Sequence, residues 1–250
     1  MFSATFVDSG LLLKKIIEFI NYKDFLQEVN FVFTESVLFI QSMDSSHISL
    51  IDITVKKDRI KNYTCNTTVS LGINLDLFTK ILKSSPNNTD CRLTLPDDNT
   101  LQIEYFTTTT CVSKYKLKLI DIQTDRVQIP TSSDYKCSQD LNFIEFNKQC
   151  QDLSLFGDEI TIQQTTDNLV LSTNNDLVDA TLFCKGVGGN CVMSVVLSVK
   201  YLLWFSKVSG ICDKLLLHLD DGDKPIFFQP ISVGDSSIDF KFFLSAKETL

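Results

Sequence analysis

The segment LGINLDLFTKILK, residues 71–83, carries the pattern from which the fold is most directly predicted. Its large apolar side chains recur at helical spacing, at Leu75, Phe78 and Leu82. Its polar face carries Asp76, Lys80 and Lys83. The pattern predicts an amphipathic helix that buries one side and turns lysines away from the core.

The end of this helix returns later in the chain as part of a long-range duplication. Four segments recur in the same order: Phe78-Thr79-Lys80 as Phe205-Ser206-Lys207, Leu93 to Asp98 as Leu217 to Gly222, Thr34 to Phe39 as Thr166 to Leu171, and Lys116 to Leu119 as Lys241 to Leu244. Each match follows its partner at a similar distance along the chain. Two copies of one domain are therefore expected, at residues 1–120 and 135–250, joined by a connecting loop at residues 121–134.

Each copy has the pattern of a helix, strands, a second helix and further strands. Three more apolar stripes are predicted: Leu13, Ile16, Ile17 and Ile20; Phe143, Phe146, Cys150 and Leu153; and Val199, Leu202, Leu203 and Ser206. Outward positions then include Lys14, Lys148 and Gln151, and on the fourth helix Lys200, Trp204 and Lys207. Alternating segments between the helices indicate strands that are buried on one face. The fold class is thus α+β, a duplicated domain with two helices against antiparallel sheets in each copy.

Composition indicates an ordinary globular chain and argues against several functions. With 250 residues and a net charge of −8, the protein is not expected to coat itself with nucleic acid, although a local basic surface is allowed. The eight cysteines form no CxxC pair, so we expect buried free thiols, no metal site and no cofactor. His47 and His218 are the two histidines, and neither lies in a nucleophile motif, so no enzymatic activity is expected.

Two other polar features have ordinary structural interpretations. The glycine-rich residues 185–189 lack the spacing of a phosphate-binding loop and are interpreted as a strand connection. The acidic pairs Asp97-Asp98 and Asp220-Asp221 are predicted to be solvated hairpin turns.

The segment QSMDSSHISL, residues 41–50, resembles the proliferating cell nuclear antigen family, the sliding clamps of eukaryotes. Similar segments extend through the chain: residues 11–18, 71–83, 115–122, 146–158, 201–207, 224–229 and 240–247. The resemblance implies a head-to-tail homotrimer in which six domains close into a ring around duplex DNA. Such a ring needs only a weak, sequence-independent attraction for phosphates.

The resemblance also implies which residues face the DNA. They are Lys14, Lys15, Lys23, Lys80, Lys83, Lys148, Lys200 and Lys207. The third helix departs from the family, because basic or histidine positions are replaced by Gln151 and Leu155. Trp204 is expected to pack against a neighbouring helix rather than to stack on bases.

A second implied site binds client proteins beneath the connecting loop. The matching pocket residues are Met43, His47, Val127, Ile129, Pro130, Pro225, Phe243, Ser245 and Ala246. Methionine suits a surface that adapts to different partners. The exposed apolar Val127 and Ile129 on a polar loop are likewise typical of a contact surface.

The subunit contact implied by the family joins an edge strand of each domain, near Val112 to Leu119 and Val178 to Cys184. The interface residues expected there are Tyr115, Leu117, Val178, Ala180 and Leu182.

Implied partners are DNA polymerase, a clamp loader ATPase, flap endonuclease, DNA ligase and other replication and repair proteins with clamp-interaction motifs, with no membrane association. Nuclear localisation follows from the family alone. The alternatives are a subunit of a DNA-damage checkpoint clamp and a viral clamp-like accessory factor.

Overall fold

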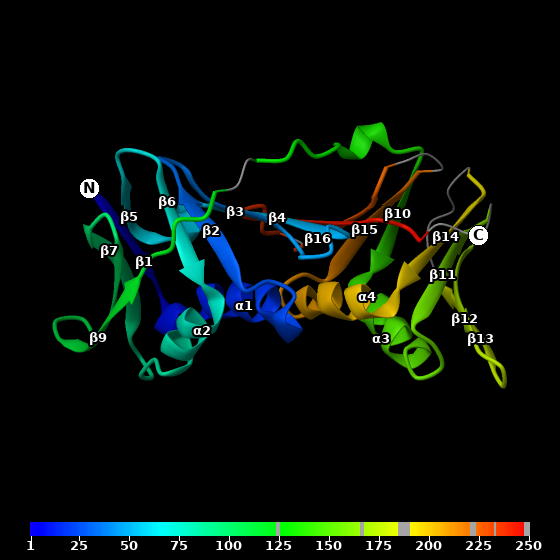
Figure 1. The fold of residues 1–250 in the computed structure, drawn as a ribbon, viewed down its shortest axis with the longest axis horizontal. Helices are drawn as coiled ribbons and strands as arrows, with labels where there is room; N and C mark the ends of the chain where they lie inside the picture. The colour runs from blue at the N-terminus through cyan, green and yellow to red at the C-terminus, as the bar shows by residue number, and fades with distance from the viewer. Residues whose placement is uncertain (124–125, 166–167, 185–190, 221–223, 233, 248–250) are drawn as a thin grey trace. The chain divides into compact units, whose positions relative to one another are not determined.

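A computed structural model describes residues 1–123, 126–165, 168–184, 191–220, 224–232 and 234–247 (Figure 1). The chain divides into two compact units. Unit 1 comprises Met1–Ser45 and Asp52–Arg126, and unit 2 comprises Ser46–Ile51 and Val127–Leu250. The division after Arg126 falls inside the segment expected to connect the domains, while residues 46–51 belong to the second unit.

Unit 1 begins with a strand and a helix, followed by five strands, a second helix and three strands. The elements are β1 (Phe2–Phe6), α1 (Leu11–Ile20), β2 (Glu28–Phe33), β3 (Val37–Met43), β4 (Ser49–Lys56), β5 (Lys61–Cys65), β6 (Val69–Asn74), α2 (Leu75–Lys83), β7 (Asp90–Asp97), β8 (Thr100–Phe106) and β9 (Cys111–Lys118). The first three residues of β4, 49–51, are those that belong to unit 2. One sheet has the order β5-β1-β7-β8-β9, so β9 lies at its edge. Strands β4, β3, β2 and β6 are neighbours in that order.

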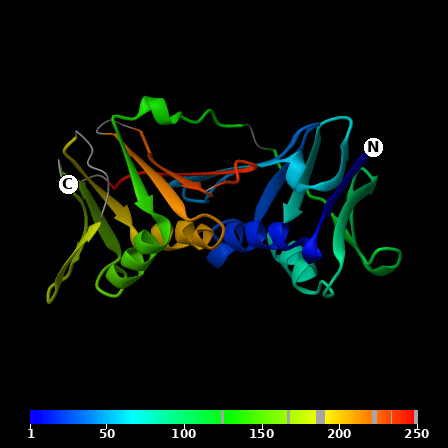
Figure 2. The same cartoon turned by 180° about the vertical axis from the view of Figure 1, so that it is seen from behind.

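The two helices of unit 1 lie side by side and bury the apolar stripes that the sequence predicts (Figures 1 and 2). Leu13, Ile16 and Ile17 of α1 are buried, as are Phe78 and Leu82 of α2. The Nδ2 of Asn21 donates to Thr79 Oγ1 at 3.0 Å and to Asp76 Oδ1 at 3.2 Å, which fixes α1 against α2. Asn74 caps α2, because its side-chain oxygen accepts from the Leu77 amide at 3.0 Å.

Unit 2 repeats this order with one strand fewer between the helices. Its elements are β10 (Cys137–Asn142), α3 (Phe143–Leu153), β11 (Glu159–Gln164), β12 (Leu169–Asn174), β13 (Asp179–Cys184), β14 (Met193–Ser198), α4 (Val199–Phe205), β15 (Lys214–Leu219), β16 (Ile226–Ile231) and β17 (Ile238–Leu244). One sheet has the order β13-β12-β11-β14, so β13 is an edge strand. Strands β10, β15, β16 and β17 are neighbours in that order, and all strand pairs are antiparallel. The fold is α+β, as predicted.

The duplication is visible in a pair of equivalent turns. The hydroxyl of Thr34 accepts from the Val37 amide between β2 and β3, at 3.2 Å. The hydroxyl of Thr165 accepts from the Asn168 amide between β11 and β12, at 3.0 Å. Thr34 and Thr165 therefore hold equivalent positions in the two turns, whereas residues 166 and 167 of the expected match lie outside the described residues.

The fourth helix differs from its prediction at one position. Trp204, expected on the outward face, is only 1% exposed and packs edge-on against Phe242 of β17, with ring centroids 5.4 Å apart. The helix α4 has only seven residues and continues directly into a 3-10 helix at Ser206–Gly210. Trp204 lies inside α4 itself, so its burial comes from β17, which covers this side of the short helix, and not from a change in the number of residues per turn.

One cysteine expectation is also wrong. Cys137, the first residue of β10, forms a disulfide with Cys191, just before β14. Their Cα atoms are 6.2 Å apart although the residues are 54 positions apart in sequence. No local spacing reveals such a pair, because only the folded unit 2 brings the two segments together. Of the six free cysteines, five are buried as expected and Cys111 is exposed.

The two acidic turns differ in the structure. Asp97 is exposed at the end of β7, and hydrogen bonds from Thr100 and from the Asn99 amide lower the pKa of its carboxyl group. Asp220 is buried and pairs with Lys224 at 3.7 Å, contrary to the prediction of a solvated turn. Residues 221 and 185–189, which belong to the two polar features noted above, lie outside the described residues.

Candidate DNA-facing and partner-binding surfaces

The lysines predicted to face DNA in unit 1 lie on and beside its two helices. Lys15, Lys80 and Lys83 are exposed, and Lys14 is half-buried. A small hollow between α1 and α2 is lined by Lys14, Ile17, Glu18, Thr79, Leu82 and Lys83. Lys23, just beyond α1, is exposed and its ammonium lies 5.4 Å from the ring centre of Tyr22. Unit 1 therefore places lysines from both helices around one surface.

Unit 2 carries a similar set on its own helices. Lys148 of α3, Lys200 of α4 and Lys207 are all exposed. The side-chain Nδ2 of Asn147 donates to Ser209 Oγ at 2.9 Å, which joins α3 to the 3-10 helix that holds Lys207. Gln151 and Leu155, the two departures from the family pattern, are both exposed and carry no charge.

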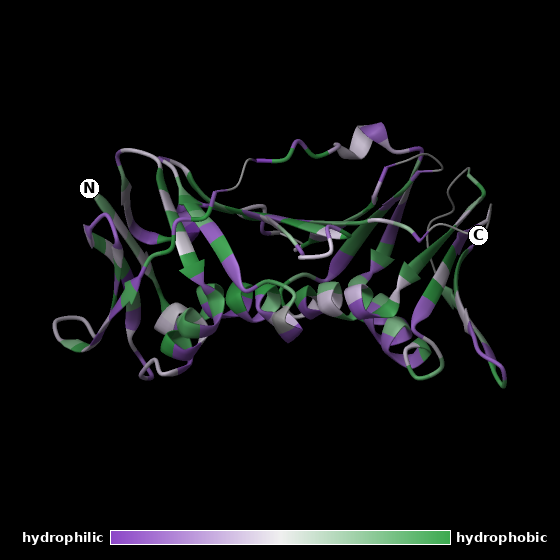
Figure 3. Cartoon of the chain, viewed as in Figure 1, coloured by the Kyte–Doolittle hydropathy of each residue, from purple (hydrophilic) through white to green (hydrophobic). Residues whose placement is uncertain are grey.

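The helix surfaces mix charges rather than forming a uniformly basic patch. Figure 3 shows both polar and apolar residues around the helices. Exposed carboxylates accompany the lysines, among them Glu18, Asp76, Glu145 and Asp152. Long-range attraction of such a surface for phosphates is weak and independent of base sequence. This property is what a protein that slides along DNA requires.

The first part of the connecting segment is attached to unit 1. The Ile120 amide donates to the Gly72 carbonyl at 2.9 Å, and a side chain at position 72 would overlap the Ile120 carbonyl oxygen. The Asn30 side chain donates to the Ile122 carbonyl at 2.9 Å. The guanidinium of Arg126 then lies over the Phe39 ring, 3.9 Å from its centre. Close backbone packing thus explains the glycine at position 72.

The last part of this segment is ordered within unit 2. Thr131 and Asp134 form a capping box, which lowers the pKa of the Asp134 carboxyl through hydrogen bonds from the Thr131 amide and hydroxyl. The hydroxyl of Tyr135 donates to the Pro225 carbonyl at 2.8 Å. Lys224 donates to the Asp134 carbonyl and lies 5.8 Å from the Tyr135 ring centre. Tyr135 therefore holds the predicted pocket residue Pro225, a role that the sequence analysis missed because the two are far apart in the chain.

The other predicted pocket residues of unit 2 differ in exposure. His47 is exposed, and its backbone is in the left-handed region, with φ 56°. The backbone carbonyl of the following residue, Ile48, accepts a hydrogen bond from the Ser245 amide at 2.9 Å. Ser245 and Ala246 are exposed, Val127 is 45% exposed, and Ile129 and Pro130 are half-buried. Phe243 is instead buried and stacks on Phe227, with ring centroids 4.6 Å apart. Met43 is half-buried at the end of β3 in unit 1.

A buried histidine lies beneath Tyr135. His218 stacks on Phe227 with centroids 4.7 Å apart, and its Nδ1 lies 2.7 Å from Ser138 Oγ. Burial lowers the pKa of His218, so the neutral ring is favoured. His218 is therefore a core residue of unit 2.

The residues predicted at the subunit contact lie on the two edge strands, mostly on their inward sides. Leu117 is buried and Tyr115 is half-buried, with its hydroxyl accepting from Ser84 Oγ at 3.0 Å. Ala180 and Leu182 of β13 are also half-buried, whereas Val178, just before the strand, is exposed. The exposed side chains of these strands are others: Cys111, Val112, Lys114, Lys116 and Lys118 on β9, and Asp179, Thr181 and Phe183 on β13.

Two features are absent from the described part of the chain. No group of three or more His, Cys, Asp or Glu side chains is arranged there to hold a metal ion. No helix in the same residues is both long enough and apolar enough to cross a membrane.

Comparisons with known proteins identify the family. The model of the family described as proliferating cell nuclear antigen, N-terminal domain, matches residues 1–128, which is just over half of the chain. A curated relative from Paramecium bursaria Chlorella virus 1, named "Probable DNA polymerase sliding clamp 2", is 28% identical over 249 residues, covering 96% of this chain and 89% of the relative. The chain therefore belongs to the proliferating cell nuclear antigen family of DNA sliding clamps, which are non-enzymatic processivity factors.

Proposed function

We propose that this chain assembles into a homotrimeric ring that encircles duplex DNA and tethers a DNA polymerase to its template. The observation that carries this proposal is the presence of exposed lysines on or next to all four helices, in both units. Encirclement makes tight binding unnecessary, and the net charge of −8 keeps the rest of the surface away from DNA. The viral relative named as a polymerase sliding clamp supports the same function.

The first prediction tests the lysine surface. Changing Lys80, Lys83 and Lys207 together to alanine should lower the affinity of the ring for duplex DNA by about tenfold and flatten its salt dependence, because fewer counterions are released. Processive primer extension should shorten in parallel. The measurements are a salt titration of DNA binding and product lengths with the cognate polymerase.

A matched control changes three exposed lysines away from the helices, Lys56, Lys57 and Lys61. This control should leave DNA binding and processivity close to those of the unchanged protein, and both variants should keep the unchanged oligomeric mass. Equal losses in the two variants, or dissociation of the helix variant, would show that the helices do not form the DNA surface.

The proposed clients are proteins that carry clamp-interaction motifs: DNA polymerase, the clamp loader ATPase, flap endonuclease, DNA ligase and other repair proteins. Support comes from the exposed apolar Val127 and the half-buried Ile129 and Pro130 on the connecting segment, together with Pro225 held by Tyr135. An apolar surface next to polar residues is typical of peptide-binding sites.

The second prediction concerns this client surface. Changing Val127 and Ile129 to serine should weaken binding of a peptide with a clamp-interaction motif by at least about tenfold, since apolar contact area is lost. Isothermal titration calorimetry measures the effect. Changing the equally apolar, 73% exposed Val192 to serine is the control and should leave the affinity unchanged.

A second candidate function is favoured by the viral origin of the relative: an accessory factor that uses the fold without docking such clients. Failure of the unchanged trimer to bind the peptide would favour this alternative.

Nuclear localisation is part of the main proposal and is supported by the family alone. Imaging of the tagged chain in its host cell tests it.

A further inference from the structure

Three stacked rings on neighbouring strands of unit 2 connect a histidine to the proposed client pocket. Strand pairing places His218 of β15 beside Phe227 of β16, and Phe227 beside Phe243 of β17. The ring centroids of His218 and Phe227 are 4.7 Å apart, and those of Phe227 and Phe243 are 4.6 Å apart. We name these three rings the aromatic row. The row ends at Phe243, which the family resemblance assigns to the pocket.

Tyr135 covers the aromatic row and links it to a second pocket residue. Its ring centre lies 5.8 Å from that of His218 and 5.9 Å from that of Phe227. Its hydroxyl donates to the Pro225 carbonyl at 2.8 Å. Because protein interiors are close-packed, rings in contact cannot move independently. A displacement of His218 would therefore reach Pro225 through Tyr135 and Phe243 through Phe227.

The surroundings of His218 favour its neutral form. The residue is only 2% exposed, and its Nδ1 lies 2.7 Å from Ser138 Oγ. No described residue supplies a hydrogen-bond partner for its Nε2. A protonated ring carries a hydrogen on both nitrogens, so protonation would leave a buried, charged donor unsatisfied. Burial lowers the pKa of His218 accordingly, and the Gln229 side chain offsets only part of this effect.

The charged groups around the aromatic row already have partners. The ion pairs are Asp220 with Lys224 at 3.7 Å, Lys241 with Asp239 at 3.2 Å, and Lys214 with Asp140 at 3.2 Å. In the segment that covers the row, the Asp134 carboxylate belongs to a capping box. Tyr135 is neutral, because burial raises its pKa. Burial therefore decides which form of His218 is stable.

We propose that His218 is a positioning residue of the client pocket: its neutral ring holds Phe243 and Pro225 in place, and its protonation weakens client binding. This role rests on the proposed client binding and adds a dependence on pH. Since the folded row disfavours the charged ring, the ordered row is fully populated above the ordinary histidine pKa of about 6.5. It is lost progressively as the pH falls below that value.

The pH profile of client binding tests this role in the full-length protein. The ligand is a histidine-free peptide with a clamp-interaction motif, and fluorescence anisotropy measures its dissociation constant. The constant should rise at least about fivefold between about pH 7.5 and about pH 5.5. His218→Phe keeps a stacked ring that cannot be protonated, so it should bind within about threefold of the unchanged protein at the higher pH and show a flat profile. His218→Gln, which lacks the ring, should bind more weakly, also with a flat profile.

The second histidine of the chain is the matched control. His47 is exposed and is also assigned to the pocket, so it could titrate in the same range. His47→Gln should keep the pH dependence of the unchanged protein, whatever its effect on affinity. Loss of the pH dependence in His47→Gln, together with its retention in His218→Phe, would assign the effect to His47 and overturn the role of His218.

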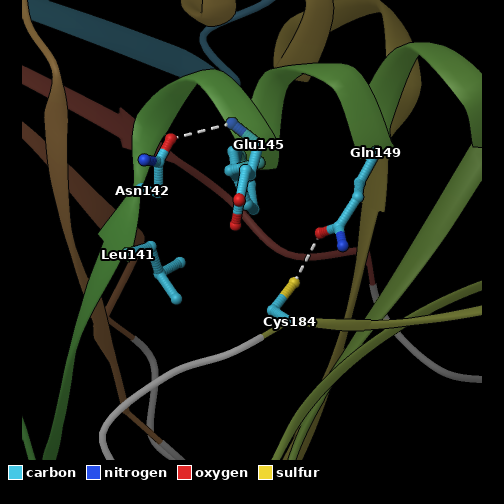
Figure 4. Close-up of a pocket in the computed structure, with 6 residues that line it drawn as sticks. Leu141, Asn142, Glu145, Gln149 and Cys184 are labelled. Atoms are coloured by element: carbon cyan, nitrogen blue, oxygen red, sulfur yellow. Dashed lines mark hydrogen bonds between the residues drawn. The ribbon is translucent and has the colours of Figure 1, made fainter.

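A further control separates this effect from a general loss of stability in unit 2. Gln149 of α3 accepts from the Cys184 thiol at 2.7 Å, as Figure 4 shows, and its Nε2 donates to the Phe183 carbonyl at 3.3 Å. Gln149→Ala removes both hydrogen bonds and leaves the aromatic row unchanged. This variant should keep the pH profile of the unchanged protein. A much steeper loss of binding in acid would show that binding follows the unfolding of unit 2 and not the protonation of His218.

The outcomes separate the role of His218 from client binding itself. If the unchanged protein binds the peptide equally well at both pH values, the role of His218 is wrong and client binding stands. If the unchanged protein binds no peptide even at the higher pH, the proposed client binding fails and the role of His218 fails with it. An independent check is the proton resonance of the His218 ring, which should titrate below about 6.5. A midpoint above that value would contradict a buried, neutral ring.

Discussion

Trp204→Ala should destabilise unit 2 by about 3–5 kcal/mol, the usual cost of removing a large aromatic side chain from a core. The indole is 1% exposed and packs on Phe242, so truncation leaves a cavity between α4 and β17. Chemical denaturation followed by circular dichroism measures the change, as a shift of the unfolding midpoint to lower denaturant. The single tryptophan of the chain also gives a direct check, because a buried indole emits at shorter wavelength than a solvated one.

Two variants make this prediction specific. Trp204→Phe keeps most of the buried volume and should cost clearly less than the alanine change. Lys200→Ala, on the exposed side of the same helix, should change stability by no more than about 0.5 kcal/mol. If Trp204→Ala costs as little as Lys200→Ala, the tryptophan lies on the outward face that the sequence pattern assigned to it.

Breaking the disulfide between Cys137 and Cys191 should lower stability by about 4 kcal/mol on the chain-entropy model, because the bond closes a long segment of the unfolded chain. Either reduction or the paired change of both cysteines to serine tests this. The measurement is the denaturation midpoint with and without reductant. The effect should be confined to unit 2, where both cysteines lie.

Thiol counting gives an independent control. Alkylation of the denatured, unreduced protein should label six cysteines, and prior reduction should raise the number to the full eight. Cys111→Ser, which removes an exposed free thiol, should leave the midpoint unchanged. Labelling of all eight without reductant would contradict the pairing. Since reducing compartments keep most protein thiols reduced, the DNA-binding experiments should be made in both states.

The DNA surface and the client surface can be tested independently of each other. Lys80, Lys83 and Lys207 lie on or next to helices, whereas Val127 and Ile129 lie on the connecting segment. The lysines act through their charge and the release of counterions, whereas Val127 and Ile129 act through burial of apolar area. A change in either set of residues therefore leaves the interaction of the other set intact. A variant that loses only one activity would show that sliding and client binding are separate properties of the same chain.

The sequence predicted features that depend on local periodicity and on internal repetition. Stripes such as Leu75, Phe78 and Leu82 identify a helix and its buried face, because residues three and four apart share one side of a regular helix. Ordered matches such as Phe78 with Phe205 identify the duplicated α+β domain. The same reasoning was wrong at Trp204, because a strand from later in the chain, β17, covers the side of α4 that the periodicity assigns to solvent.

The fold class, the duplicated organisation, the family resemblance and the lysine-bearing helices could all be inferred from the sequence. The contacts between distant residues became known from the folded structure. It joined Cys137 to Cys191, placed the Tyr135 hydroxyl on the Pro225 carbonyl, and showed which side chains of β9 and β13 are exposed, among them Lys114, Asp179 and Phe183. The physical reason is that periodicity reports neighbours along one element, whereas such contacts depend on how separate elements pack, which no local spacing encodes.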